Sequence, residues 1–170
     1  MDTLIMIVLP IIAGAFIVGY GIWKTIQFKN QDTSLQYPFT PVRLVAPAAA
    51  LLDAINEYRA EELTTVPAYL FADSIACYLA QDRCYEMIEN YKLSHDNWAN
   101  AASELIGLGS DAVGENIAYG YATIAGVMDA WKRSAGHNKN MLNPKWQYIG
   151  ISIVKDSEGR NWYCTLFLND

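Results

Sequence analysis

One stretch near the start constrains what this chain can fold into: from Thr3 to Trp23 it carries no charged side chain. At about 1.5 Å of rise per residue, a helix over this stretch would be roughly 31 Å long, close to the hydrocarbon thickness of a bilayer. A buried core helix rarely exceeds about 14 residues without a polar face. A cleaved signal peptide would begin with basic residues, whereas only Asp2 is charged before the stretch. We therefore expect residues 1–24 to form a single transmembrane helix that contacts the membrane through residues 3–23.

Prolines mark the segment after the predicted anchor. Pro38, Pro41 and Pro47 fall within ten positions, and prolines at this density favour extended backbone over a helix or a packed core. We expect residues 25–47 to be a tether and residues 48–170 to form one globular domain.

The expected domain is acidic. After Pro47 the chain has nine Lys or Arg residues and sixteen Asp or Glu residues, a net charge of −7. Phosphates and anionic lipid headgroups repel such a domain, so nucleic acid is not an expected partner.

The three cysteines carry little information about disulfides. Cys77 and Cys84 lie seven positions apart on one expected helix, hence about 10 Å apart along it, which is too far for a bond between them. At most one of them can reach Cys164. We interpret all three as small buried hydrophobic side chains.

Hydrophobic periodicity predicts helices first and strands last. Helices are expected over residues 48–62, 68–91 and 97–106, followed by a glycine-marked loop and a helix that Thr123 caps and that ends near Ser134.

The end of the chain changes to a strand pattern. Residues 148–154 are rich in β-branched side chains, residues 156–159 form a turn, and residues 161–168 are rich in aromatic side chains. This pattern predicts a β-hairpin. Helices that cover an antiparallel sheet make the expected fold class α+β.

Two histidines and one glutamate are candidates for chemistry. His95 and His137 lie in stretches that look like loops, and Glu115 lies between them beside Gly114. Two imidazoles and a carboxylate could hold a divalent metal such as zinc, or act as a general acid–base set. The alternative is that each side chain only hydrogen-bonds a loop backbone.

Five short motifs occur in a fixed order along the domain. They are Leu52-x-x-Ile55-Asn56-x-x-Arg59, Leu93-Ser94-His95, Gly114-Glu115-Asn116-Ile117-Ala118-Tyr119-Gly120, Trp131-x-x-Ser134-Ala135-Gly136-His137-x-x-Asn140-Met141-Leu142, and Gly150-x-Ser152 with Trp162-Tyr163-x-Thr165-Leu166-Phe167. In this order they resemble the CAP superfamily, which includes cysteine-rich secretory proteins, antigen 5 and plant pathogenesis-related proteins. The bacterial SCP-domain branch is the more similar part of that superfamily, and the resemblance covers residues 51–168.

The resemblance implies an α-β-α sandwich with a shallow cleft in which two histidines and two acidic residues converge. His95, Glu115 and His137 match three of these positions, whereas the fourth, normally a Glu, is Gly126 here. Asp129 is three residues further along the same helix but has a shorter side chain. The resemblance therefore implies a cleft in which three ligands and a water molecule could still hold zinc.

Three functions remain open. Members of the superfamily are associated with lipid or sterol binding, signalling, defence and, in a few cases, proteolysis. We favour a membrane-anchored, non-enzymatic module that binds a protein, a lipid or a small ligand in the cleft. The alternatives are a metal-dependent hydrolase that uses His95, Glu115 and His137, and an accessory subunit of a membrane or virion assembly. The small residues Gly14, Ala15 and Gly19 are the only hint of helix packing for such an assembly.

Two arguments disagree about the side of the membrane on which the domain lies. Lys24 and Lys29 follow the predicted anchor, and the positive-inside rule then places the domain in the cytoplasm. The resemblance to largely secreted proteins places it outside. Because two lysines are a small bias, we expect an extracytoplasmic domain.

Overall fold

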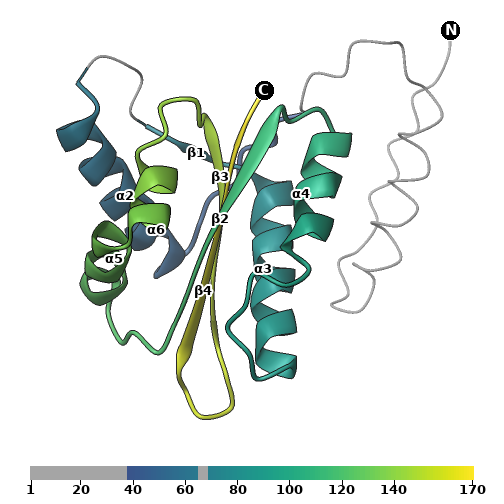
Figure 1. Ribbon diagram of the computed structural model, residues 1–170, viewed down its shortest axis with the longest axis vertical. Coiled ribbons are helices and arrows are strands. Elements are labelled where there is room, and N and C mark those ends of the chain that lie inside the picture. The colour runs from purple at the N-terminus through teal and green to yellow at the C-terminus, as the bar shows by residue number, and fades with distance from the viewer. Residues whose placement is uncertain (1–37, 65–68) are drawn as a thin grey trace, which may run out of the picture. The chain divides into compact units, whose positions relative to one another are not determined.

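The computed structural model describes residues 38–64 and 69–170 (Figure 1). The anchor predicted for residues 1–24 lies outside these residues, as does most of the predicted tether. In the part of the chain that is described, no helix combines the length and apolar character that a membrane span requires.

The domain combines five helices and four strands within the described residues. In chain order they are α2 (Ala48–Glu62), β1 (Phe71–Ala72), α3 (Ser74–Glu89), α4 (Trp98–Gly107), β2 (Ala112–Tyr119), α5 (Ile124–Arg133), α6 (Ala135–Met141), β3 (Tyr148–Lys155) and β4 (Asn161–Asn169). The predicted mixture of helices and sheet is confirmed.

The strands form one sheet in the order β1-β3-β4-β2. The pairs β3–β4 and β4–β2 are antiparallel, whereas β1 pairs with β3 in parallel. The predicted hairpin is confirmed, and Gly159 adopts the positive φ of 78° that its turn requires. Figure 1 shows α3 and α4 on one face of the sheet and α2, α5 and α6 on the other, so the domain is an α-β-α sandwich.

Alternation along β4 divides the core between the two faces of the sheet. Cys164, Leu166 and Leu168 pack with α3 and α4, whereas Tyr163 and Phe167 pack with α2, α5 and α6. All five side chains are buried. The period of two therefore predicts which side chain meets which layer.

A close contact joins α3 to the sheet. A Cβ atom added to Gly150 of β3 would lie 2.2 Å from the carbonyl carbon and oxygen of Ala76. No side chain fits between them, so glycine allows the helix backbone to approach the strand directly.

The helix predicted for residues 68–91 begins later than expected. It starts at Ser74, because the Asp73 side chain caps it by accepting a hydrogen bond from the Ala76 N–H at 2.8 Å. Phe71–Ala72 before the cap is a strand, and two residues are too few to show a period.

Two further elements differ from the sequence prediction. Gly114, interpreted as part of a loop, lies inside β2, where an added Cβ would come within 3.1 Å of the Trp146 ring. The absence of a side chain at Gly114 thus allows close packing against Trp146 and does not form a turn. His137 was also assigned to a loop, but it lies in the short helix α6.

The last residues of the predicted tether pack on the sheet edge. The backbone N–H of Thr40 donates to the Asp73 carboxylate at 2.8 Å, and the ring of Phe39 stacks on Tyr148 with centroids 4.4 Å apart. Residues from Phe39 onward therefore contribute to the domain.

Candidate functional site

The three candidate residues come from different elements and lie close together. His95 lies in the loop between α3 and α4, Glu115 in β2 and His137 in α6. His95 Nδ1 is 2.7 Å from Glu115 Oε2, and the rings of His95 and His137 have centroids 6.4 Å apart. The fold thus brings together side chains that are up to 42 positions apart in the chain.

A buried arginine that the sequence analysis did not single out completes this cluster. Arg83 of α3 donates from Nε to Glu115 Oε1 at 2.8 Å, and the two side chains are only 4% and 2% exposed. Glu115 therefore has one oxygen on a guanidinium and the other on an imidazole. A signal was present in the sequence, because Arg83 lies in line with Leu79 and Met87 on the apolar face of its helix.

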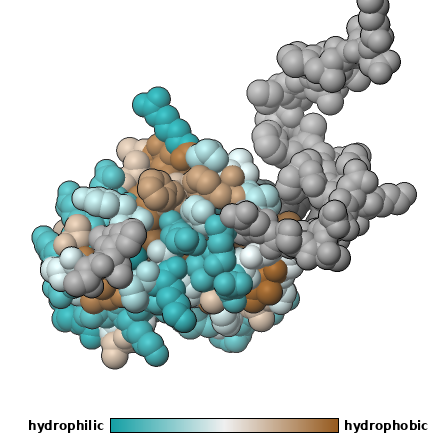
Figure 2. All heavy atoms as spheres, turned by 90° about the horizontal axis from the view of Figure 1, so that it is seen from above, coloured by the Kyte–Doolittle hydropathy of each residue, from teal (hydrophilic) through white to brown (hydrophobic). Residues whose placement is uncertain are grey.

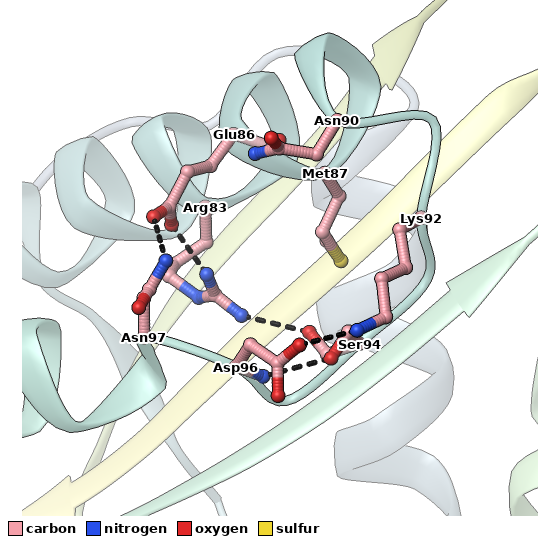
Figure 3. Close-up of a pocket in the computed structure, with 8 residues that line it drawn as sticks. All are labelled: Arg83, Glu86, Met87, Asn90, Lys92, Ser94, Asp96 and Asn97. Atoms are coloured by element: carbon pink, nitrogen blue, oxygen red, sulfur yellow. Dashed lines mark hydrogen bonds and ion pairs between the residues drawn. The ribbon is translucent and has the colours of Figure 1, made fainter.

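Arg83 also holds the loop that carries His95 (Figure 3). Its Nη2 donates to the Ser94 carbonyl at 3.0 Å, and its Nη1 pairs with Glu86, which in turn accepts from Asn97 at 2.9 Å. Burial alone would lower the pKa of Arg83, but the bonds to Glu115 and Glu86 outweigh burial and raise it. The guanidinium is therefore a fixed positive charge beneath the loop.

The loop closes over a polar cavity of about 290 Å³. Lys92 and Asp96 pair across it at 2.6 Å, and the Asp96 N–H donates to Ser94 Oγ at 3.0 Å. Figure 3 shows these side chains directed toward one another, although those of Lys92 and Asp96 are exposed. The charges around this cavity are thus paired within the loop and α3.

Two asparagines tie β2 to α6. Asn116 donates to the His137 carbonyl at 3.1 Å, and Asn140 donates to the Glu115 carbonyl and to the Asn116 side chain, both at 3.0 Å. Arg59 of α2 holds the end of α6 through the Met141 carbonyl at 2.5 Å. These bonds fix the position of His137 relative to Glu115.

His137 is half-buried in the cluster. Burial, and then the nearby charge of His95, lower the pKa of His137. Its ring lies 6.2 Å from the ring of Trp131, centroid to centroid. His137 is therefore a neutral imidazole near pH 7.

Gly126 occupies the third position of α5. The Thr123 side chain caps this helix, as predicted, and accepts from the Gly126 N–H at 3.1 Å. A Cβ at position 126 would lie 3.3 Å from Thr123 Oγ1 and 3.5 Å from the Tyr121 ring. Asp129, further along the helix, is exposed.

An apolar groove of about 310 Å³ lies beside the cluster. Its walls come from the His95 loop, β2, the loop before α5, and the helices α5 and α6. The lining residues are Leu93, Ile117, Ala118, Tyr119, Tyr121, Ala130, Trp131, Ser134 and His137.

The metal-ligating side chains of the described residues do not form a ready set of metal ligands. Within residues 38–64 and 69–170, no group of three or more His, Cys, Asp or Glu side chains is placed to hold a metal ion. Both oxygens of Glu115 are engaged, by Arg83 and by His95, and the Glu115 side chain is only 2% exposed. Zinc binding by His95, Glu115 and His137 stays a prediction.

The α-β-α sandwich holds His95 and His137 near Glu115, and each of these residues belongs to one of the five sequence motifs. This combination is typical of a known class of protein. The chain belongs to the CAP family, described as the cysteine-rich secretory protein family, whose sequence model matches residues 52–166. The predicted resemblance is thereby confirmed.

Individual relatives are similar over limited regions. The uncharacterized protein YkwD of Bacillus subtilis is 45% identical over 49 residues, which are 29% of this chain and 19% of that protein. The match thus spans about a fifth of that relative.

Solved structures share the fold at low identity. An outer surface protein from Borrelia burgdorferi has a TM-score of 0.65 at 19% identity, covering 77% of this chain and 98% of that chain. An extracellular SCP-domain protein from Bacillus anthracis has a TM-score of 0.63 at 21% identity, covering 76% of this chain and 45% of that chain. These likenesses establish the fold alone.

Proposed function

We propose that the chain is a membrane-anchored CAP-domain module that binds a ligand or a partner in its groove and does not catalyse a reaction. The observation that carries this proposal is the state of Glu115, whose two oxygens are both engaged inside the domain. A general base must come within hydrogen-bond reach of its substrate, and the Glu115 side chain is only 2% exposed. Glu115 instead balances the buried charge of Arg83.

The buried thiols of Cys84 and Cys164 are not activated as nucleophiles. Burial raises the pKa of Cys84 to about 12 and that of Cys164 well above its usual value. Both thiols therefore stay protonated and out of contact with solvent.

The groove has the character of a recognition site. Leu93, Tyr121 and Trp131 form apolar walls, and His137 contributes a polar edge. Such a combination suits an apolar group that carries one hydrogen-bonding atom. The ionic cluster beneath would hold the walls in place.

Anchoring rests on the uncharged stretch from Thr3 to Trp23, which is long enough to cross a bilayer. We place the domain outside the cytoplasm, as largely secreted family members suggest.

The substitution Glu115→Gln tests the non-catalytic role. If Glu115 supports the fold, this change leaves buried Arg83 with only the partly exposed Glu86 as a counter-charge and lowers the free energy of unfolding by about 3 kcal/mol. Urea denaturation followed by circular dichroism measures the change.

Glu158→Gln is the matched control, because Glu158 pairs with Arg160 at an exposed position and its loss should change stability by less than about 0.5 kcal/mol. Catalytic carboxylates are commonly held at a cost in stability. A Glu115→Gln variant as stable as the wild type, or more stable, would therefore contradict the supporting role and favour the hydrolase alternative.

A further inference from the structure

A row of exposed apolar side chains follows the β1 edge of the sheet. Tyr69 and Phe71 are 61% and 60% exposed, and Val45 of the segment before α2 is 77% exposed. Val42 of the same segment is also exposed, and its N–H donates to the Ala72 carbonyl at 3.3 Å, so the segment lies beside β1. We name Val42, Val45, Tyr69 and Phe71 the β1-edge surface.

Two basic side chains border the β1-edge surface. Arg43 lies within its first segment, and Lys145 lines, together with Tyr69 and Phe71, a cavity of about 370 Å³. The domain after Pro47 has a net charge of −7. A basic border is therefore a local departure from the charge of the whole domain.

The end of the sheet at which β1 lies is the one seen in Figure 2. That view shows hydrophobic residues in several places on this face, with hydrophilic residues between them. Exposed apolar side chains that gather along one edge, as those of the β1-edge surface do, mark interaction sites. Aromatic rings next to Lys or Arg are the combination that favours the headgroup region of a bilayer.

The position of the surface along the chain favours a membrane as its partner. Thirteen residues, 25–37, separate the predicted anchor from Pro38, and fully extended they span at most about 47 Å. The chain enters the described domain at Pro38, four residues before Val42. Val42 and Val45 of the β1-edge surface are thus close to the anchor along the chain, and a short tether gives the surface a high effective concentration at the bilayer.

We propose that the β1-edge surface lies against the headgroup region of the bilayer that holds the anchor. Tyr69 and Phe71 enter the interface, and Arg43 and Lys145 contact lipid phosphates. This inference rests on the anchoring proposed above, and it assigns the domain one preferred orientation on the membrane.

A fluorescent label tests the contact in the full-length chain. Phe71→Cys would carry a thiol-linked environment-sensitive dye, and the chain would be reconstituted in vesicles of phosphatidylcholine and phosphatidylglycerol. The native thiols react slowly, because burial raises the pKa of Cys77 to about 11 and of Cys84 to about 12. We expect a blue-shifted emission and loss of iodide quenching at position 71.

Matched labels make the result specific. Tyr69→Cys should behave like Phe71→Cys, whereas Ser157→Cys in the exposed β3–β4 turn should stay fully quenched. Wild-type chain treated with the same dye measures labelling at native thiols. A thermal melt of each labelled chain verifies its fold, and either Tyr69→Cys or Phe71→Cys suffices for the measurement.

The outcomes separate the two proposals. If the chain floats with the vesicles but positions 69 and 71 are quenched as strongly as 157, the docking inference is overturned while the anchor stands. If the chain does not float with the vesicles, the anchoring proposal fails and this inference fails with it. Protection that appears only at high protein density indicates contact between copies of the chain, and overturns the membrane contact.

Discussion

Arg83 connects three parts of the chain through one guanidinium group. It contacts Glu115 on β2, the Ser94 carbonyl in the His95 loop, and Glu86 on its own helix. A surface ion pair contributes little to stability, but a buried pair leaves an uncompensated charge when either partner is lost. The position of His95 therefore depends on the buried ion pair between Arg83 and Glu115 in the core.

His137 should titrate below the ordinary histidine pKa of about 6.5. Burial is the larger cause and the charge of His95 the smaller. His95→Ala should therefore raise the pKa of His137 only part of the way to its usual value. NMR titration of the ring protons measures both pKa values, and a wild-type value at or above the ordinary one would contradict the assignment.

The lowered pKa of His137 also fixes the sign of a pH effect on stability. The unfolded chain binds a proton at His137 more tightly than the folded chain, so the free energy of unfolding falls as pH drops through about 6.5. His137→Gln should remove this part of the pH dependence, which urea denaturation at several pH values would reveal.

Among the elements, α5 is capped but lacks one supporting contact. The Thr123 side chain accepts from the Gly126 N–H, and a Glu at position 126 would complete a capping box. A Cβ at position 126 would lie 3.3 Å from Thr123 Oγ1, so the capping side chain would have to shift by a few tenths of an ångström to admit it. The fourth cleft position that the resemblance implies, normally a Glu, is thus a glycine that leaves the Thr123 cap undisturbed.

Gly126→Glu should stabilise the domain by about 1 kcal/mol, because it adds the reciprocal cap and replaces a glycine in a helix. It should also tighten zinc binding by supplying the acidic position that is missing beside His95, Glu115 and His137. Calorimetric zinc titration of the full-length chain measures this effect. Gly126→Ala is the control, since it keeps the helix gain without a carboxylate. If neither wild type nor Gly126→Glu takes up zinc, the metal prediction is wrong.

Elements with a clear period could be predicted from the sequence, and short or irregular ones could not. The helix Ala48–Glu62 and the strands Tyr148–Lys155 and Asn161–Asn169 follow regular patterns and were found. The strand β2 was missed because its Gly114 serves close packing against Trp146, which only the tertiary structure reveals. The helix α6 was missed because seven residues are too few to show a period.

Some residues of the candidate site could be predicted from the sequence, and others could not. His95, Glu115 and His137 were found from their motifs, since chemically distinctive residue types are visible in sequence. The partners Arg83, Asn116 and Asn140 were not, because their roles depend on which face each side chain takes. Glu115 itself looked free in the sequence, and the ion pair that occupies it is a consequence of tertiary packing.

For the whole molecule, the boundary between tether and domain can be measured by truncation. Deleting Met1 to Lys24 should give a folded chain that no longer floats with membranes. Deleting residues 1–47 removes the Thr40–Asp73 bond and the stacking of Phe39 on Tyr148, and should cost about 2 kcal/mol of stability relative to the shorter deletion. Thermal melts and vesicle flotation give the comparison. Aggregation of the shorter deletion would contradict the predicted anchor boundary.

The contact between Gly150 and Ala76 extends beyond local packing. The helix that it seats against the sheet carries Arg83, so a single methyl group added at position 150 would lift that helix and draw the guanidinium away from Glu115. Neither Gly150 nor Ala76 faces the groove. A substitution at either of these two small residues would therefore disturb the histidine cluster without changing any residue that lines the groove.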